Sequence, residues 1–369
     1  VTLPAILLLL EFRPLNRLSA ASWRRLVVEK IPLFLLAGAV AVVTLLTTAH
    51  GGVVGSISRY PIDARAANVV VAYGTYLLKM VWPHSMACLY PYNLNLPAGQ
   101  IAGSALAFLV LSGVALLAGR RQRHLLTGWF WFAIMLLPVI GIVQAGPQSM
   151  ADRYSYLSLV GVFIMIAWSV PSGRPAVFSA VAVTLVLLYA SRAWVQAGTW
   201  KNSLTLFRHA VEVTRNNDMA HNNLGLLLAD EGRLDEAVAQ YQESLRINPG
   251  FSFARNNLGN ALMMKGQLDE AILHFNEALR SDPDYAEAKN NLGIAMARQG
   301  RFDEAIEFFM AALKANPDNV GRQKNLLLAI DKLRDKKKAA AYYRTALDMA
   351  ETANEPELAD LIREKLSNP

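Results

Sequence analysis

Two groups of polar residues have types and spacings that suit chemistry or binding. In the first, ionisable side chains flank long apolar stretches. Asp152 and Arg153 come directly before one such stretch, and an ionisable residue at the edge of a membrane segment suggests a functional site. An arginine can clamp a phosphate through paired N–H donors, while Asp152 orients that arginine or a metal ion. We predict a lipid-phosphate or substrate site formed by Asp152, Arg153, Tyr154, Arg59, Arg65, Lys79 and His84.

Each member of this ionisable group also has a structural interpretation. Asp152 and Arg153 would then form an ion pair at the membrane surface, with the arginine reaching toward water. Arg59, Arg65 and Lys79 would each contact lipid headgroups. His84 would be either a proton carrier or a structural side chain. The sequence leaves these alternatives open.

The second group is a series of asparagines that recurs at a constant interval in the second half of the chain. An amide side chain both donates and accepts hydrogen bonds, so one amide per repeat along a stack of helices suits an extended peptide backbone. We predict an acceptor-peptide site formed by these amides; the alternative is that they only cap helices or face water. The residues are Asn223, Asn257, Asn291 and Asn325, together with their neighbours Asn222, Asn256 and Asn290.

Several other classes of site are excluded by composition and motif. Cys88 is the only cysteine, which rules out an internal disulfide and a cysteine-based zinc site. The sequence has no glycine-rich phosphate loop, no His-Glu-x-x-His and no Gly-x-Ser-x-Gly, and its six histidines are scattered. The basic run 336–338 is too short for a nucleic-acid patch. We therefore predict no metal, no bound cofactor and no nucleic-acid partner.

Charge divides the chain into two parts that must position these groups. Residues 1–200 hold 14 Lys or Arg and 4 Asp or Glu, a net charge of +10, whereas residues 201–369 hold 22 and 25, a net charge of −3. Acidic groups are nearly absent from the first part, as expected where charge is kept out of hydrocarbon. The sequence thus predicts an integral membrane domain followed by a soluble one.

Five uncharged stretches in the first part are long enough to cross a bilayer, which takes about 20 residues. A sixth span would be completed by residues 1–10, which resemble the tail of a membrane helix and not a signal peptide. The five predicted spans are Ile31–Ala49, Ile101–Ala118, Leu125–Gly146, Tyr154–Pro171 and Pro175–Ser191.

Basic residues predict the orientation of these spans. Segment 11–30 and the loop after residue 118 are rich in arginine, and such loops face the cytoplasm. This assignment requires residues 66–82, which contain Lys79 and end in Trp82, to lie in the membrane interface as an amphipathic helix. The second half of the chain is then extracytoplasmic, in the periplasm if the membrane is a bacterial inner membrane.

The second part repeats at an interval of about 34 residues, the length typical of tetratricopeptide helix–turn–helix repeats. Asn-Asn-Leu-Gly recurs three times, an acidic Asp-Glu-Ala motif follows each copy, and a proline closes each unit. Small residues allow the two helices to approach, and an aromatic residue fills the space between them. The three prolines are Pro249, Pro283 and Pro317, and the aromatic residues are Tyr241, Phe275 and Phe309.

The predicted fold is therefore all-α: a polytopic transmembrane helical domain followed by a tetratricopeptide solenoid. We predict an incomplete repeat at the junction, and a degenerate last repeat followed by a capping helix, because terminal repeats of solenoids are atypical. The predicted divisions are 1–193 for the membrane domain, 194–217 for the junction, 218–251, 252–285, 286–319 and 320–353 for the repeats, and 354–369 for the capping helix.

This combination resembles the transmembrane and tetratricopeptide-repeat O-mannosyltransferases and their bacterial relatives, of the GT-C glycosyltransferase superfamily. The resemblance covers nearly the whole chain. Its residues are Val1-Thr2-Leu3-Pro4, Leu7–Leu10, Arg65, Tyr73, Tyr76-Leu77-Leu78-Lys79, Trp82-Pro83, Tyr90-Pro91 and Ala151-Asp152-Arg153-Tyr154-Ser155-Tyr156-Leu157.

The resemblance implies a transferase that moves a sugar from a polyprenyl-phosphate carrier to a protein hydroxyl on the extracytoplasmic side. The repeats would bind the acceptor, as a similar asparagine ladder does in cytosolic O-GlcNAc transferase. In the GT-C class the catalytic carboxylates lie in the first outward loop, which we expect upstream of Val1. Two alternatives are a non-catalytic, membrane-anchored repeat scaffold and an O-antigen-ligase-like enzyme.

Overall fold

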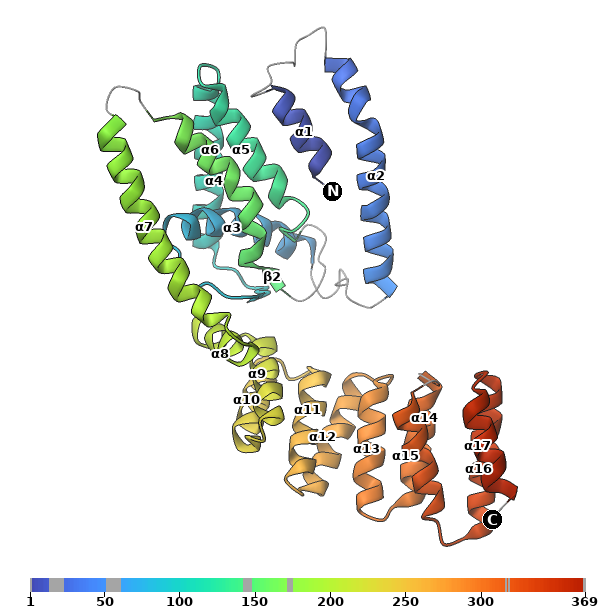
Figure 1. The fold of residues 1–369 in the computed structure, drawn as a ribbon. Helices are drawn as coiled ribbons and strands as arrows, with labels where there is room; N and C mark the ends of the chain where they lie inside the picture. The colour runs from blue at the N-terminus through green and yellow to red at the C-terminus, as the bar shows by residue number, and fades with distance from the viewer. Residues whose placement is uncertain are drawn as a thin grey trace. The chain divides into compact units, whose positions relative to one another are not determined.

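The computed structural model describes residues 2–12, 23–50, 61–141, 148–170, 175–315, 317 and 319–367. In these ranges the protein is all-α apart from one two-stranded pairing, which confirms the predicted fold class. The chain divides into two compact units, Val1–Asn216 and Asn217–Pro369. Both units are shown in Figure 1.

The first unit holds the apolar helices. Among the described residues, three helical stretches are long and apolar enough to cross a membrane: Trp23–Thr44, Ala98–Gly119 and Ala176–Thr199. They match three of the predicted spans. The helices of this unit are α1 (Leu3–Phe12), α2 (Trp23–His50), α3 (Ile62–Val81), α4 (Ala98–Gly119), α5 (Arg123–Leu136), α6 (Ser155–Trp168), α7 (Pro175–Thr199) and α8 (Ser203–Val213).

The other two predicted spans form shorter helices. Helices α5 and α6 have 14 residues each, or about 21 Å at 1.5 Å per residue, compared with a hydrocarbon core of about 30 Å. Helix α5 ends at Leu136 because Pro138, which has no backbone N–H, cannot donate the next helical hydrogen bond. The two helices pack closely through Gly128 and Gly161, where a Cβ atom on either glycine would collide with the other's carbonyl oxygen.

Helix α3 contains the stretch predicted to lie in the interface. It is not among the three candidate spans of the described residues, and Figure 1 shows it running across the view while α2, α5, α6 and α7 run up and down. Its buried face carries Tyr73 and Tyr76. Tyr73 packs against Phe132 and Phe108 at ring-centroid distances of 5.8 and 4.8 Å. These aromatic contacts form the core that fixes α3 against α4 and α5.

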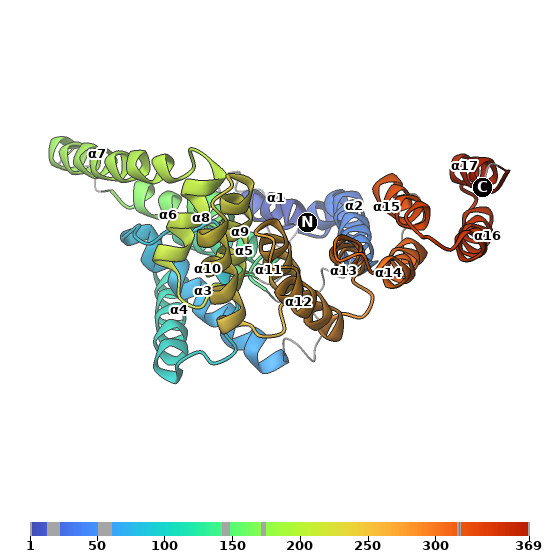
Figure 2. The ribbon, with the colours of Figure 1, turned by 90° about the horizontal axis from the view of Figure 1, so that it is seen from below.

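The second unit is a series of helix pairs with the predicted period (Figures 1 and 2). Within each of the first three pairs a glycine admits an aromatic ring: a Cβ atom on Gly259 would lie 2.6 Å from the ring of Phe275. The first helices of the repeats are α9 (Asp218–Asp230), α11 (Ser252–Met264), α13 (Ala286–Arg298) and α15 (Val320–Asp331). The second helices are α10 (Leu234–Ile247), α12 (Leu268–Ser281), α14 (Phe302–Ala315) and α16 (Lys336–Thr352), and α17 (Pro356–Ser367) follows them.

The fourth repeat departs from this packing. Leu327 occupies the position of the glycine, so the ring of Tyr343 cannot approach α15 as the other rings approach their first helices. The Tyr343 hydroxyl instead donates a hydrogen bond to Asp331. A cavity of about 380 Å³, lined mainly by apolar residues of α14 to α17, lies between these helices. The degenerate sequence thus corresponds to looser packing.

Candidate functional site

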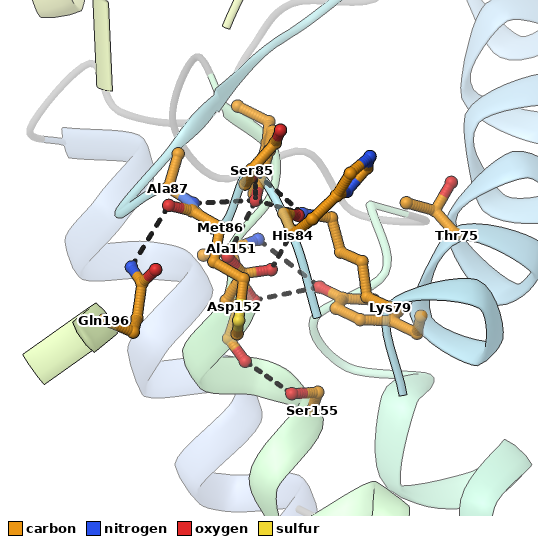
Figure 3. A network of polar contacts seen from close by, with 12 residues as sticks. Thr75, Lys79, His84, Ser85, Met86, Ala87, Ala151, Asp152, Ser155 and Gln196 are labelled. Carbon is orange, nitrogen blue, oxygen red and sulfur yellow. Dashed lines mark hydrogen bonds and ion pairs between the residues drawn. The ribbon is translucent and has the colours of Figure 1, made fainter. Parts of the chain in front are cut away.

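Asp152 lies at the centre of a buried polar network (Figure 3). It begins a short 3₁₀ turn, Asp152–Tyr154, between strand β2 (Gln148–Met150) and helix α6. Only 4% of its surface is exposed. Its Oδ2 accepts hydrogen bonds from the Ala87 N–H at 2.9 Å and from the Tyr90 hydroxyl at 2.7 Å. The Lys79 ammonium lies 3.8 Å from Oδ1, so the carboxylate is held on both oxygens.

Lys79 is equally constrained by the network. Its Nζ donates to the Tyr90 hydroxyl at 2.6 Å and to the Ser85 carbonyl at 3.0 Å. The same nitrogen lies 4.6 Å from the centroid of the Tyr90 ring. A cation in contact with a carboxylate, a hydroxyl and a carbonyl has few donors left for an external phosphate. Lys79 therefore acts as the partner of Asp152.

Burial and charge act in opposite directions on these groups. Burial lowers the pKa of Lys79 and raises the pKa of Asp152, and in each case the partner's charge opposes the shift. Burial, together with the nearby Asp152 carboxylate, raises the pKa of Tyr90. Two opposite charges that are buried together and hydrogen-bonded compensate one another, whereas one left alone is strongly unfavourable. The pair is thus stable only as a unit.

The loop that supplies the Ala87 N–H is held from several elements. The Met86 carbonyl accepts hydrogen bonds from Gln196 of α7 at 3.2 Å and from His209 of α8 at 3.1 Å. On the other side, the Tyr76 hydroxyl of α3 donates to the Ala151 carbonyl at 3.0 Å. The network therefore joins α3, β2, α6, α7 and α8, and its geometry is typical of a structural hub.

Two other members of the predicted lipid-phosphate group, Arg153 and Arg65, lie in different surroundings. Arg153 is exposed; its guanidinium donates to the Cys88 carbonyl at 3.2 Å and lies 5.0 Å from the ring of Tyr154. Arg65 is near the first turn of α3 and Lys79 near the last, about 21 Å apart along the helix.

His84 joins the network through its backbone, since its carbonyl lies 3.5 Å from Lys79 Nζ. Arg59 lies outside the described residues. Within the described ranges, no three His, Cys, Asp or Glu side chains gather as ligands for a metal ion.

Sequence reasoning missed Tyr90 and Tyr76 as members of the network. Tyr90 is 62 residues from Asp152, and Tyr76 is 75 residues from Ala151. No local spacing connects such residues. The Tyr90-Pro91 pair contributed to the family resemblance, but its role became visible only when β1 (Tyr90–Pro91) paired with β2.

The asparagines of the repeats bond to one another between neighbouring first helices. An Nδ2 of each later repeat donates to an Oδ1 of the repeat before it. The bonds are Asn257 to Asn222 at 2.9 Å, Asn291 to Asn256 at 3.0 Å and Asn325 to Asn290 at 3.1 Å.

These bonds commit part of each amide to holding the repeats together. Asn256 and Asn291 are buried by their contact, which leaves them little surface for a peptide. Asn223 and Asn257 are partly exposed and are better placed to meet one. The asparagine series therefore combines a structural contact with a partly open row of amides.

Family models support the repeats. Two tetratricopeptide-repeat models match residues 217–284 and 256–320. Together these matches cover the first three helix pairs, in which the glycine, aromatic and proline positions are all present.

Curated relatives are distant and cover only part of the chain. A protein O-mannosyl-transferase of Caenorhabditis elegans, F38B6.6, is 30% identical over 123 residues, 32% of this chain and 17% of that protein. The human protein O-mannosyl-transferase TMTC4 is 29% identical over 188 residues, 47% of this chain and 25% of that protein. The chain thus matches about a quarter or less of the length of either relative.

Two solved structures are weakly similar to this chain. A crystal structure of MamA protein is 20% identical, with a TM-score of 0.37 over 47% of this chain and 94% of that one. The first repeat domain of Spaghetti (RPAP3), bound to an HSP90 peptide, is 19% identical, with a TM-score of 0.32 over 32% of this chain and 94% of that one. The chain therefore contains tetratricopeptide repeats, has three candidate membrane helices among its described residues, and is distantly similar to protein O-mannosyl-transferases.

Proposed function

We propose that this chain is part of a membrane-bound protein glycosyltransferase, and that its repeat domain holds the acceptor polypeptide. The observation that carries the proposal is the joint presence of candidate membrane helices, tetratricopeptide repeats and distant similarity to O-mannosyl-transferases. The partly exposed amides of Asn223 and Asn257 give the repeats groups that can bond to a peptide backbone. The repeat domain would lie on the extracytoplasmic side of the membrane.

The donor in this proposal is a polyprenyl-phosphate sugar. An acceptor hydroxyl would displace the phosphate at the anomeric carbon, and Arg153 would stabilise the negative charge on the departing phosphate. Arg153 suits this role because it is exposed and makes its hydrogen bond to a carbonyl, not to a carboxylate. Asp152 and Lys79 would position this turn without contacting the sugar, since each is engaged by the other.

A second function, a non-catalytic scaffold, is favoured by a different observation. Asp152 and Lys79 are bonded to other groups of the buried network, whereas polar side chains of the repeats, such as Asn223 and Asn257, are partly exposed. A membrane-anchored repeat scaffold would use only the exposed polar side chains of the repeats. It would bind polypeptide without transferring sugar.

One experiment separates these functions. Membranes containing the chain are incubated with radiolabelled polyprenyl-phosphate mannose and an unfolded acceptor polypeptide, and both cross-linking to the chain and label on the acceptor are measured. We expect binding and transfer, with transfer lowered at least tenfold by Arg153→Ala. Arg24→Ala is the matched control, since Arg24 is exposed at the start of α2.

The acceptor side is tested in the same assay. Asn223→Ala combined with Asn257→Ala should weaken cross-linking, whereas Asn276→Ala should not, because Asn276 bonds to its own helix in α12. Binding without transfer supports the scaffold. If the chain neither binds nor transfers, the proposal is wrong, and transfer that Arg153→Ala leaves unchanged removes the assigned role of Arg153.

A further inference from the structure

The four segments that connect the first and second helices of the repeats lie next to one another along one edge of the second unit. They are residues 230–236, 264–270, 298–304 and 332–338, one period apart. A side-chain contact joins each segment to the next: Lys265 to Asp235 at 2.6 Å, Gln299 to Asp269 at 2.6 Å, and Lys338 to Asp303 at 2.7 Å. The segments therefore form one continuous surface, which we call the turn edge.

The charge of the turn edge changes sign from its first segment to its last. The first segment holds one basic and four acidic residues, a net charge of −3, and the two that follow have net charges of −1 and 0. The last segment holds five basic residues and one acidic residue, a net charge of +4. We call this last segment, residues 332–338, the basic turn.

The lysines of the basic turn do not serve the helix that they begin. Helices α10, α12 and α14 each have an Asp-Glu pair in the first turn, whereas α16 has no acidic residue there. Positive charge at this end opposes the helix macrodipole. Asp335 caps α16 by accepting hydrogen bonds from the Lys337 and Lys338 N–H groups at 2.9 and 3.1 Å. The stability of α16 thus does not account for its lysines.

Three cations of the basic turn are available to an external anion. Lys332, Arg334 and Lys337 are exposed, and among the described residues no hydrogen bond or ion pair engages their side chains. The nearby Asp331 carboxylate is already paired with Lys365 of α17, at 2.7 Å. These three side chains therefore keep their full capacity to donate hydrogen bonds.

The acidic end of the turn edge does not complement the basic turn, because its carboxylates are already paired. Arg233 contacts Glu231 at 3.1 Å and Glu236 at 2.7 Å, and Asp235 contacts Lys265. A second copy that placed its acidic end on the basic turn would have to break these pairs. An occupant of the basic turn must therefore supply anions of its own.

The surroundings of the basic turn indicate which anions these are. On α15, Lys324, Leu328 and Lys332 recur at intervals of four residues, so they share one side of the helix, and Leu328 is 51% exposed. A leucine between lysines is typical of segments at a bilayer surface. Residues 324–338 contain no aromatic residue on which a nucleic-acid base could stack. The first unit has candidate membrane helices, so a bilayer lies within reach of the chain.

We infer that the basic turn, together with Leu328, binds the anionic headgroups of a lipid bilayer. Arg334 and the lysines contact the headgroup phosphates, and Leu328 enters the headgroup layer. The paired acidic end of the turn edge has no attraction for such a surface. This inference goes beyond the proposed function and holds whether the chain transfers sugar or acts as a scaffold.

Binding to vesicles tests this inference with the full chain in nanodiscs of neutral phosphatidylcholine. Sucrose-loaded vesicles of phosphatidylcholine, with or without phosphatidylglycerol, are added and pelleted, and the fraction of the chain in the pellet is measured. We expect at least tenfold tighter binding to the vesicles with phosphatidylglycerol, weakening as salt screens the charges. Equal binding to both vesicles, or binding to neither, would overturn the inference.

Two charge-matched variants locate the surface. Arg334→Gln combined with Lys337→Gln should weaken binding to the anionic vesicles at least tenfold, since each cation near such a surface contributes roughly fivefold. Arg280→Gln combined with Lys314→Gln removes the same charge from the last turns of α12 and α14 and should have little effect. All four side chains are exposed, so we expect unchanged melting temperatures. Equal weakening by both variants would show that the basic turn is not the site.

A third variant distinguishes a bilayer from an acidic polypeptide, for which poly-glutamate is the probe. Leu328→Ser should weaken vesicle binding at least threefold and leave poly-glutamate binding unchanged, because only a bilayer takes up the leucine. Leu273→Ser is the control, since Leu273 is 64% exposed but lies on a second helix. If Leu328→Ser binds the vesicles as tightly as the unchanged chain does, the basic turn does not recognise a bilayer and the inference is wrong. The acceptor cross-linking and sugar-transfer assays decide the proposed function independently of these results.

Discussion

The Asp152 network and the asparagine series of the repeats use polar residues in opposite ways. In the network, each charge meets its partner inside the protein: Lys79 and Tyr90 both contact Asp152, and the surrounding backbone supplies the remaining bonds. In the asparagine series, amides such as that of Asn257 donate one bond to the preceding repeat and stay partly exposed. Residues with the most reactive side chains are therefore not the ones most available to a ligand.

The physical reason is burial. A buried charge must be compensated within the protein, so the strongest groups of the network hold one another. An amide at the surface can exchange hydrogen-bond partners, because water or a peptide can replace a partner that is lost. We expect the network to be sensitive to the loss of a single member and the asparagine series to be tolerant.

The largest effect should follow Asp152→Ala. This change leaves the Lys79 ammonium buried without its counter-charge and removes the acceptor for the Ala87 N–H and the Tyr90 hydroxyl. Breaking a buried pair on one side costs about 3–5 kcal/mol. The free energy of unfolding of the chain in detergent should fall by this amount, while Asp63→Ala, at an exposed aspartate of α3, should have little effect.

A double variant sharpens this prediction. Lys79→Met combined with Asp152→Ala removes both charges, so its loss should be smaller than the sum of the single losses. Additive losses would contradict the assignment of Asp152 and Lys79 as a unit, and the contrast with the asparagine series would weaken.

An intermediate effect is expected for Asn257→Ala in the repeats. The variant removes the 2.9 Å bond to Asn222, and a single hydrogen bond of this kind contributes about 0.5–1.5 kcal/mol. In urea unfolding of the repeats, the free energy of unfolding should fall by an amount in this range. A loss as large as that of Asp152→Ala would mean that the asparagines are as indispensable as the buried network, and the comparison would fail.

The smallest effect concerns pH. Burial lowers the pKa of His274 in α12, although nearby Glu277, 3.6 Å away, opposes the shift. The folded protein thus binds this proton less readily than the unfolded chain does, so stability is present above pH ~6.5 and is lost as the pH falls through the folded pKa. Measured between pH 7 and 5, this part of the slope should vanish in His274→Gln. An unchanged slope would assign the pH dependence to other groups.

Prediction from the sequence succeeded where structure is local. The regular recurrence of Gly259 and its equivalents, each followed by an aromatic residue such as Phe275, reflects a contact between two helices joined by a short turn. Such contacts depend on spacing that the chain displays directly. Three of the five predicted spans follow from apolar length in the same way.

Prediction was limited where residues meet across long separations. Asp152 was singled out by its type and place, but the sequence did not indicate that Tyr90, 62 residues away, would bind its carboxylate. Nor did it show that Arg65 and Lys79, both on α3, would lie near opposite ends of that helix. The predicted orientation in the membrane and the catalytic carboxylates stay predictions.

The two-part organisation, the apolar helices and the repeats can be predicted from the chain alone, because hydrophobic length and periodicity are properties of consecutive residues. Which polar groups pair inside the protein, and which remain accessible to a ligand, depends on tertiary packing. Helix α3, strand β1 and the start of α6 enclose Asp152 and Lys79, whereas the stacking of first helices leaves Leu226, Phe253 and Leu328 exposed. Burial depends on how elements distant in the chain pack together, and burial sets what a side chain can still bind.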